Sequence, residues 1–194
     1  WNEAKENILK IIVTTKSILF LLSHQPNPRF IKQIKYLSQH YRISVIHFER
    51  EYLYDLSKEY KNNCEINIKL AKLHNGRYFS RILIYFASVY KLTLILLKNH
   101  HGLVILNNID MLALYKICSL LNRYRACTAL EISDLRSHTY TDNIRSIILR
   151  YIEKIALSYT DKLILTSPKY YEYYYKTIYR KKYFVLENKP LSYM

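Results

Sequence analysis

The sequence predicts an α/β fold with a mostly parallel sheet, and two observations lead to this prediction. Short apolar runs alternate with longer segments of helical periodicity along the chain. Nearly every apolar run ends in a small group of polar residues. Alternation of this kind builds βαβ units, in which the strands are parallel and their carboxyl ends share one edge of the sheet.

The first βαβ unit begins with the apolar run Ser17–Leu22, which is too short for a helix and ends in the polar, turn-forming residues 23–27. Pro28 then opens an amphipathic helix, since proline is favoured in the first helical turn. Ile43–Phe48 is the second strand. Ligands of such sheets bind beyond the carboxyl ends of the strands, so we expect a site at the loop His24–Arg29.

Further strands and helices alternate along the rest of the chain, while residues 1–16 are a lead-in segment without an assigned function. The expected strands are Cys64–Ile68, Leu103–Leu106, Arg125–Glu131, Lys162–Thr166 and Tyr183–Leu186. The expected helices are Arg77–Lys98, Met111–Leu121, the amphipathic Ile144–Tyr159, and a tyrosine-rich helix from Pro168 to about Tyr179 with rings that pack inward. Asp110 is well placed as the N-cap of the helix that begins at Met111.

Composition limits the classes of protein to which the chain can belong. Its 194 residues are expected to form one domain of ordinary size. Two glycines are too few for a GxGxxG dinucleotide fingerprint or a P-loop, which both need several residues without a Cβ. Cys64, Cys118 and Cys127 have no metal-binding spacing, which favours reduced thiols in a cytoplasmic protein. We therefore expect neither a metal nor another cofactor.

The net charge of +15 is spread over the whole chain and predicts a basic surface attracted to polyanions. Nucleic acid, anionic lipid and phosphorylated substrates all fit this charge. The longest apolar run, Ile82–Leu97, is shorter than the roughly 20 residues needed to span a bilayer. It is expected to form a buried helix, and the alternative is a helix lying in a membrane interface.

Several segments, taken together and in order, resemble a known family. They are SILFLLSHQPNPRFIKQIKYLSQHYRISVIHFER, VILNNIDML, ALEISDLRS, YIEKIALSYTDKLILTSPKYYEYY and FVLENKP. In order and spacing they resemble the amino-terminal domain of bacterial family 4 glycosyltransferases, whose GT-B fold consists of two Rossmann-like domains. The first loop, SHQPNPR, lacks the glycines found in many family members.

The resemblance implies a Rossmann-like, three-layer α/β/α domain over residues 17–190 that is one half of a GT-B fold, with 191–194 beginning a linker to a missing carboxyl-terminal domain. It implies a hexosyltransferase or related enzyme that moves sugar from a nucleotide-sugar donor to a glycan or lipid-linked acceptor in cell-surface polysaccharide synthesis. This domain would bind the acceptor and be inactive by itself. The nucleotide sugar is a substrate rather than a cofactor.

The polar groups that follow the strands are the candidate substrate-binding residues, because parallel strands bring them to one edge. They are His24, Asn27, Arg29, Asn108, Asp110, Glu131, Asp134, Arg136, Ser167, Asn188 and Lys189. Cationic groups among them would face phosphate, and the others would orient hydroxyl groups. No catalytic residue is assigned. The sequence contains no Asp-x-Asp, which disfavours a metal-dependent GT-A site.

Two alternatives to the transferase remain open at this point. A nucleic-acid-binding module would explain the charge and the many aromatic residues, but no recognisable nucleic-acid-binding motif occurs, so we expect no nucleic-acid partner. The second alternative to the transferase is a non-catalytic, membrane-associated module. For the transferase itself we expect a cytoplasmic location, with peripheral association at the anionic inner face of the cell membrane as a hypothesis.

Overall fold

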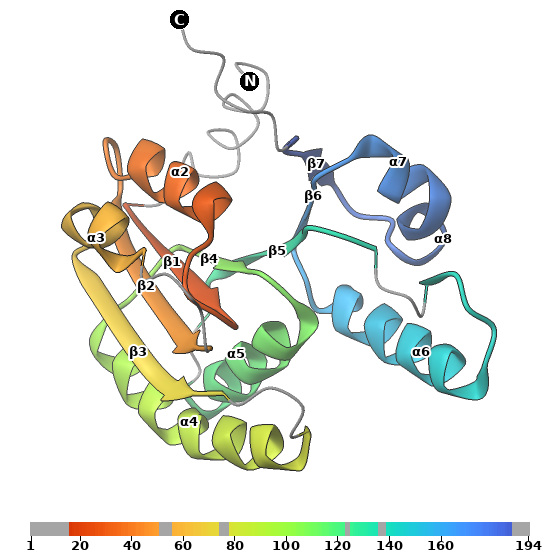
Figure 1. Ribbon diagram of the computed structural model, residues 1–194, viewed down its shortest axis with the longest axis horizontal. Coiled ribbons are helices and arrows are strands. Elements are labelled where there is room, and N and C mark those ends of the chain that lie inside the picture. Colours follow the sequence, from red (N-terminus) through yellow and green to blue (C-terminus); the bar gives the residue numbers. More distant parts are fainter. Residues whose placement is uncertain (1–15, 51–55, 74–77, 123–124, 136–138, 188–194) are drawn as a thin grey trace, which may run out of the picture. The chain divides into compact units, whose positions relative to one another are not determined.

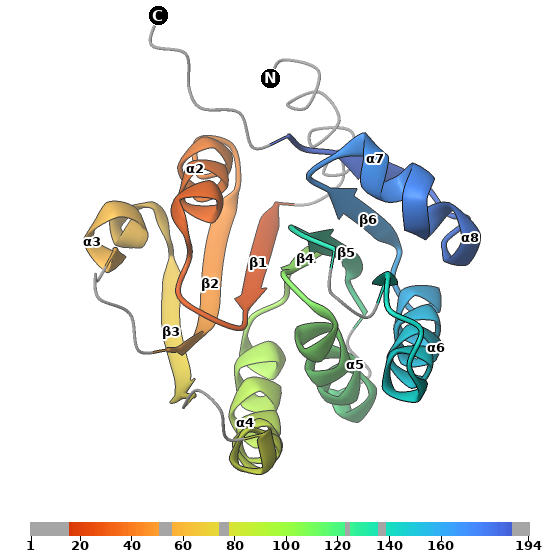
Figure 2. The ribbon, with the colours of Figure 1, turned by 45° about the vertical axis from the view of Figure 1, so that its right-hand side comes forward.

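A computed structural model describes residues 16–50, 56–73, 78–122, 125–135 and 139–187. The chain forms two compact units, one from Thr14 to Cys127 and one that holds the chain from Thr128 onward. Each unit contains parallel strands flanked by helices (Figure 1 and Figure 2). The predicted Rossmann-like α/β fold is thereby confirmed.

The first unit has the strand order β3-β2-β1-β4. The strands are β1 (Ser17–Leu22), β2 (Arg42–Glu49), β3 (Ile66–Lys72) and β4 (Leu103–Leu106). Every residue of β1 and β4 is buried, which explains why these two strands read as continuous apolar runs. The register pairs Leu22 of β1 with His47 of β2, and Leu21 with Leu106 of β4. The residues that follow β1 and β4 therefore lie next to each other.

The helices of the first unit lie on both faces of this sheet. They are α2 (Pro28–Leu37), the short α3 (Ser57–Tyr60) with a 3₁₀ turn (Lys61–Asn63), α4 (Tyr78–Lys98) and α5 (Ile109–Asn122). Helices α2 and α3 cover one face, and α4 and α5 cover the other (Figure 1 and Figure 2). Right-handed crossovers place the helices on opposite faces in this way. The chain first moves outward from β1 to β3, and it then returns past β1 to β4 in the opposite direction.

Strand β3 and helix α5 of this unit have bounds that differ from those predicted. Strand β3 runs from Ile66 to Lys72, so it begins and ends later than the predicted Cys64–Ile68. Helix α5 begins at Ile109, and its cap is Asn108, whose Oδ1 accepts a hydrogen bond of 2.9 Å from the Met111 backbone N–H. The prediction that Asp110 caps this helix is wrong, because Asp110 already lies inside the first turn.

The second unit has the strand order β5-β6-β7, with neighbouring strands parallel. Its elements are β5 (Cys127–Ile132), α6 (Ile144–Ser158), β6 (Lys162–Leu165), α7 (Pro168–Tyr170), a π-helical turn (Tyr171–Tyr175), α8 (Lys176–Ile178) and β7 (Tyr183–Val185). The Asp161 carboxylate joins the start of β6 to β5. Its Oδ2 accepts hydrogen bonds of 2.8 Å from both the backbone N–H and the hydroxyl of Thr128.

The π-helical turn determines how the tyrosine-rich segment packs. Its wider winding lets the consecutive residues Tyr174 and Tyr175 both reach Glu153 of α6, at 2.9 and 3.1 Å between hydroxyl and carboxylate oxygens. Tyr174, Tyr175 and Tyr179 are buried, as the predicted inward packing requires, while Tyr173 is exposed. Glu153 is a buried carboxyl group that accepts a hydrogen bond from each of these two phenols.

Candidate functional site

The carboxyl ends of β1 and β4 are joined by the side chain of Asn107. Its Oδ1 accepts a hydrogen bond of 3.0 Å from the Ser23 backbone N–H, and its Nδ2 donates to the Ser23 hydroxyl at 3.1 Å. The same Nδ2 lies 3.1 Å from Nε2 of His24. The parallel pairing of β1 with β4 makes this possible, because both strands end at the same level of the sheet.

The hydrogen bonds of His24 define its tautomer. Its Nδ1 lies 2.6 Å from the carbonyl oxygen of Gln25, which can only accept, so Nδ1 carries the proton. Nε2 then accepts from Asn107. With both ring nitrogens engaged, His24 fixes the shape of the loop after β1. It is in no position to take a proton from a substrate in this arrangement.

The electrostatic surroundings keep His24 neutral. Burial lowers the pKa of the imidazole below its usual range, and the positive charges of Arg50 and Arg29 lower it further. The hydrogen bond to the Gln25 carbonyl opposes this shift in pKa. Arg29 is the second residue of α2 and Arg50 follows β2, and the positive charges of both act on this imidazole. Both arginines thus bring positive charge to this part of the edge.

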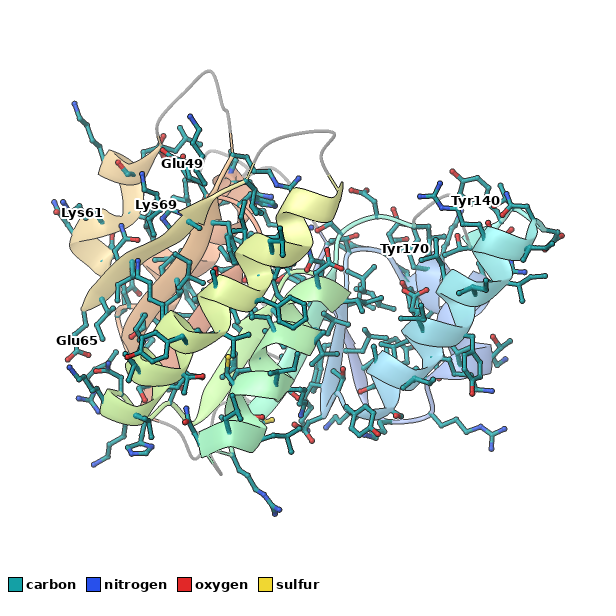
Figure 3. The ribbon with its side chains drawn as sticks, turned by 90° about the horizontal axis from the view of Figure 1, so that it is seen from below. Glu49, Lys61, Glu65, Lys69, Tyr140 and Tyr170 are labelled. Atoms are coloured by element: carbon teal, nitrogen blue, oxygen red, sulfur yellow. The ribbon has the colours of Figure 1, made fainter. Side chains whose placement is uncertain are left out.

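The neighbouring strand β2 adds a second histidine to this edge. His47 is buried, its Nδ1 lies 3.1 Å from the Phe48 carbonyl oxygen, and burial lowers its pKa. The acid at the end of β2, Glu49, forms an ion pair of 2.8 Å with Lys69 of β3 (Figure 3). The acid at the end of β2 is therefore engaged by a cation of the neighbouring strand.

Two of the predicted site residues in this unit, Asn27 and Asn108, are helix caps. Asn27 caps α2 by accepting from the Phe30 backbone N–H at 3.1 Å, and Asn108 caps α5. The guanidinium of Arg29 lies 5.3 Å from the centre of the Phe30 ring. The two caps hold the amino-terminal, electropositive ends of α2 and α5 at the carboxyl edge of the sheet. Asp110 is exposed on the first turn of α5.

Asn107, like Arg50 and His47, was not among the residues predicted for the site. The sequence offered a signal for it, because Asn107 is the first polar residue after the buried strand β4. Asn107 and Asn108 are adjacent in the sequence, and only the register of β4 against β1 decides which of the two contacts His24. Asn107 contacts His24, whereas Asn108 turns back to cap α5.

In the second unit the predicted site residues lie in different environments. Glu131 is fully buried within β5, Asp134 is exposed beyond its end, and Ser167 is half-buried before α7. The ends of β5 and β6 are joined instead by Thr166, whose hydroxyl donates to the Ser133 carbonyl oxygen at 2.6 Å. Arg136, Asn188 and Lys189 lie outside the described residues.

Taken by itself, the edge of the first unit is suited to bind an anionic group. It combines two guanidinium groups, two helix amino termini and a neutral imidazole held by an amide. Cations and N–H groups of this kind stabilise phosphate oxygens. Within the described residues, no group of three His, Cys, Asp or Glu side chains is arranged to hold a metal ion.

No protein-family model matches the sequence, and no curated protein matches it in sequence. Similar solved structures do exist. The lipopolysaccharide outer core galactosyltransferase WaaB, in its apo form, aligns with a TM-score of 0.54 at 11% identity over 81% of this chain and 41% of that protein. Sucrose-phosphate synthase from Thermosynechococcus elongatus aligns with a TM-score of 0.60 at 15% identity, over 89% of this chain and 48% of that one.

Another structure of sucrose-phosphate synthase from the same organism aligns with a TM-score of 0.57 at 15% identity, over 91% of this chain and 90% of that one. The chain thus spans less than half of the galactosyltransferase and of the longer synthase chain. At these identities the likeness concerns the fold. The chain has the Rossmann-like α/β fold that is found in glycosyltransferases of the GT-B class.

Proposed function

We propose that the chain is the amino-terminal, acceptor-binding domain of a GT-B glycosyltransferase similar to family 4. In this proposal it takes part in moving a hexosyl or related group from a nucleotide-sugar donor to a glycan or lipid-linked acceptor in cell-surface polysaccharide synthesis. The observation that carries it is the pair of arginines, Arg29 and Arg50, whose charges both act on His24 at this edge. The fold shared with glycosyltransferases supports the reaction class.

The chemistry of glycosyl transfer explains why such an edge would be useful. The reaction separates a sugar with oxocarbenium character from a departing diphosphate, and a lipid-linked acceptor itself brings a phosphate group. Arg29 and Arg50 would bind phosphate oxygens of the acceptor. The Asn107–His24 pair would hold the loop between them in place, and the α2 amino terminus would add a favourable dipole.

A second domain would bind the donor in this proposal. The chain aligns with less than half of two glycosyltransferase structures, which leaves room for such a domain in a protein of their length. The chain by itself would then bind the acceptor without turning over the nucleotide sugar. Nucleoside diphosphate binding and sugar transfer would both require the second domain.

Binding of a soluble lipid diphosphate tests the acceptor edge. We expect calorimetric titration with farnesyl diphosphate to show binding that weakens as salt is raised, because the contacts are ionic. The double variant Arg29→Ala, Arg50→Ala should lose at least about tenfold in affinity, in line with two charge-assisted contacts. Lys58→Ala, an exposed cation on α3 of the same unit, is the control and should bind like the parent.

Two results would overturn the acceptor edge as proposed. One is an equal loss of affinity in the Arg29→Ala, Arg50→Ala and Lys58→Ala proteins, which would mean that net charge rather than this edge attracts the ligand. The other is transfer of radiolabelled sugar from a nucleotide sugar by the 194-residue chain alone. Such transfer would contradict the proposal that donor binding requires a second domain.

We also include peripheral association with the anionic inner face of the cell membrane in this proposal. Helix α4 supports it, because its described side chains present an exposed apolar row: Leu83, Phe86, Tyr90, Leu94 and Leu97. No helix among the described residues is long and apolar enough to cross a bilayer. Flotation of the protein with vesicles containing phosphatidylglycerol is expected at low salt, and its absence would remove this part of the proposal.

A further inference from the structure

Helix α6 has its apolar side turned outward. Seven apolar residues of α6 and the position after it are each 44 to 78% exposed: Ile144, Ile147, Ile148, Tyr151, Ile152, Ile155 and Tyr159. Their spacing of three and four residues places them on one side of the helix, in a stripe about 140° wide at about 100° per residue. We call these seven residues the α6 stripe.

The inward side of α6 is polar instead. Ser146 and Glu153 are buried, and Glu153 accepts hydrogen bonds from Tyr174 and Tyr175. Arg150 donates to the Thr141 carbonyl oxygen at 2.8 Å and pairs with Asp142 at 3.2 Å. Among the inward residues, Leu157 supplies the fully buried apolar contact. The α6 stripe therefore leaves about half or more of the surface of each of its side chains, 44 to 78%, outside the packing of α6.

This arrangement is the reverse of an ordinary crossover helix, which turns its apolar side toward the sheet and its charged side toward water. Seven large side chains in one row form a larger apolar surface than scattered exposed residues do. Such a row needs a partner that removes it from water. The charge around the α6 stripe indicates which partner this is.

Cations border the α6 stripe on both sides. At about 100° per residue, Lys154 falls just beyond Ile147 at one border and Arg145 just beyond Ile152 at the other, and both cations are exposed. The one acid within α6 is the buried Glu153. Asp142, before the helix, is paired with Arg150. The exposed surface of α6 is thus apolar in the middle and positively charged at its borders.

We infer that α6 lies in the interface of an anionic membrane, with the α6 stripe among the acyl chains and Arg145 and Lys154 at the phosphate level. Tyrosine suits this depth because its ring is apolar and its hydroxyl is polar. Tyr151 and Tyr159 belong to the stripe, and Tyr140 is exposed beside the amino-terminal end of α6 (Figure 3). This inference rests on the membrane association proposed above and adds a contact surface in the second unit.

Single-tryptophan variants measure the depth of individual positions. Trp1 is the chain's one tryptophan, so Trp1→Phe provides a silent background. In that background, Tyr151→Trp places a reporter on the α6 stripe and Tyr173→Trp places one outside it in the same unit. Tyr151 is 66% exposed and Tyr173 is 64% exposed, which makes them a matched pair. Tyr90→Trp reports on α4 in the same way.

We expect vesicles of phosphatidylglycerol and phosphatidylcholine to shift the emission of Trp at position 151 to the blue, and brominated acyl chains to quench it. Position 173 should show neither effect. The variant Ile148→Glu, Ile152→Glu should lower the vesicle partition coefficient at least about tenfold, since each charge would enter the acyl region. Circular dichroism and thermal unfolding of each variant confirm that it is folded.

The outcomes separate the two membrane proposals. Quenching at position 90 but not at 151 would overturn the role of α6 and leave the association through α4 intact. Equal quenching at 151 and 173, or no binding to vesicles, would also overturn it. A blue shift at 151 that depends on protein concentration and needs no vesicles would mean that a second copy covers the α6 stripe, which contradicts the lipid assignment. Transferase activity on a soluble acceptor is measured independently of all of these.

Discussion

The Nδ2 amide nitrogen of Asn107 and the Nε2 ring nitrogen of His24 are 3.1 Å apart, and this contact joins the loops that follow β4 and β1. The two residues are far apart in sequence and are brought together by the parallel pairing of their strands. Because the amide donates to the neutral imidazole, the pair favours the uncharged form of His24. Asn107 therefore fixes the geometry of this edge, while burial is the main cause of the lowered pKa of His24.

Replacing Asn107 by alanine removes its hydrogen bonds to Ser23 and His24. We expect the free energy of unfolding to fall by about 1–3 kcal/mol, because the Ser23 backbone N–H loses its partner. The pKa of His24 should rise, since Nε2 no longer accepts from an amide. Urea unfolding and an NMR titration of the imidazole measure the two effects.

Asn122→Ala is the control for the Asn107 variant. It removes a side-chain hydrogen bond of 3.0 Å to the Thr93 carbonyl oxygen, between α5 and α4. It should cost about 1 kcal/mol and leave the titration of His24 unchanged. A His24 titration that is the same in Asn107→Ala and in the parent protein would show that the amide does not set the charge of the imidazole.

Acid should destabilise the first unit through His101. This residue is buried, its Nε2 lies 2.9 Å from the Ser44 hydroxyl, and burial, aided by the charge of Arg42, lowers its pKa from 6.5 to about 4. The unfolded chain binds the proton more tightly, so stability is lost as the pH falls from 6.5 toward 4. The loss amounts to about 3 kcal/mol over this interval.

Urea unfolding at pH 7.5, 6.0, 5.0 and 4.5 measures this dependence. His101→Gln should flatten the slope of unfolding free energy against pH, while His40→Gln, at an exposed position, should leave it close to that of the parent. If His101→Gln retains the full slope, other groups account for the acid sensitivity. His24 and His47, whose pKa values are also lowered by burial, would then be the next histidines to replace.

The buried carboxylate of Glu153 should be a point of high sensitivity in the second unit. Glu153→Ala leaves the hydroxyls of Tyr174 and Tyr175 without this acceptor and opens a cavity, at an expected cost of about 2–4 kcal/mol. Tyr175→Phe should cost about 1–2 kcal/mol, because the carboxylate loses one donor. Chemical unfolding of the two single variants and the double variant gives the coupling energy.

Tyr173→Phe is the matched control, since Tyr173 is exposed in the same π-helical turn. It should change stability by less than about 0.5 kcal/mol. Additive effects of Glu153→Ala and Tyr175→Phe would contradict the direct contact between them.

The Cys64 thiol should react slowly in the folded protein. Burial raises its pKa to about 11, and its Sγ lies 3.4 Å from the Tyr60 carbonyl oxygen. At pH 8 the fraction of thiolate, which is the reactive form, is then about 100-fold smaller than for an ordinary cysteine. Mass spectrometry of peptides alkylated with iodoacetamide measures the rate, with the urea-unfolded chain as reference. Equal rates in the folded and unfolded chain would show that Cys64 is accessible as thiolate.

Much of the fold could be predicted from local patterns. Strands β1 and β4 are short apolar runs with polar ends, and α2 begins at a proline behind a capping asparagine. The ends of β3 and the cap of α5 were predicted wrongly, because several polar residues near each boundary suit the same role. At the candidate site, the loop after β1 could be located, but the partner of His24 could not.

The sequence by itself determined the order of strands and helices, the excess of positive charge, and the positions of the polar loops, because these follow from residue type and short-range periodicity. Only the tertiary structure decided which residues meet. It selected Asn107 over Asn108 as the partner of His24, and it turned the apolar side of α6 outward around the buried Glu153. The physical reason is that periodicity defines the sides of a helix, whereas strand register and hydrogen-bonding partners from distant segments decide which side is buried.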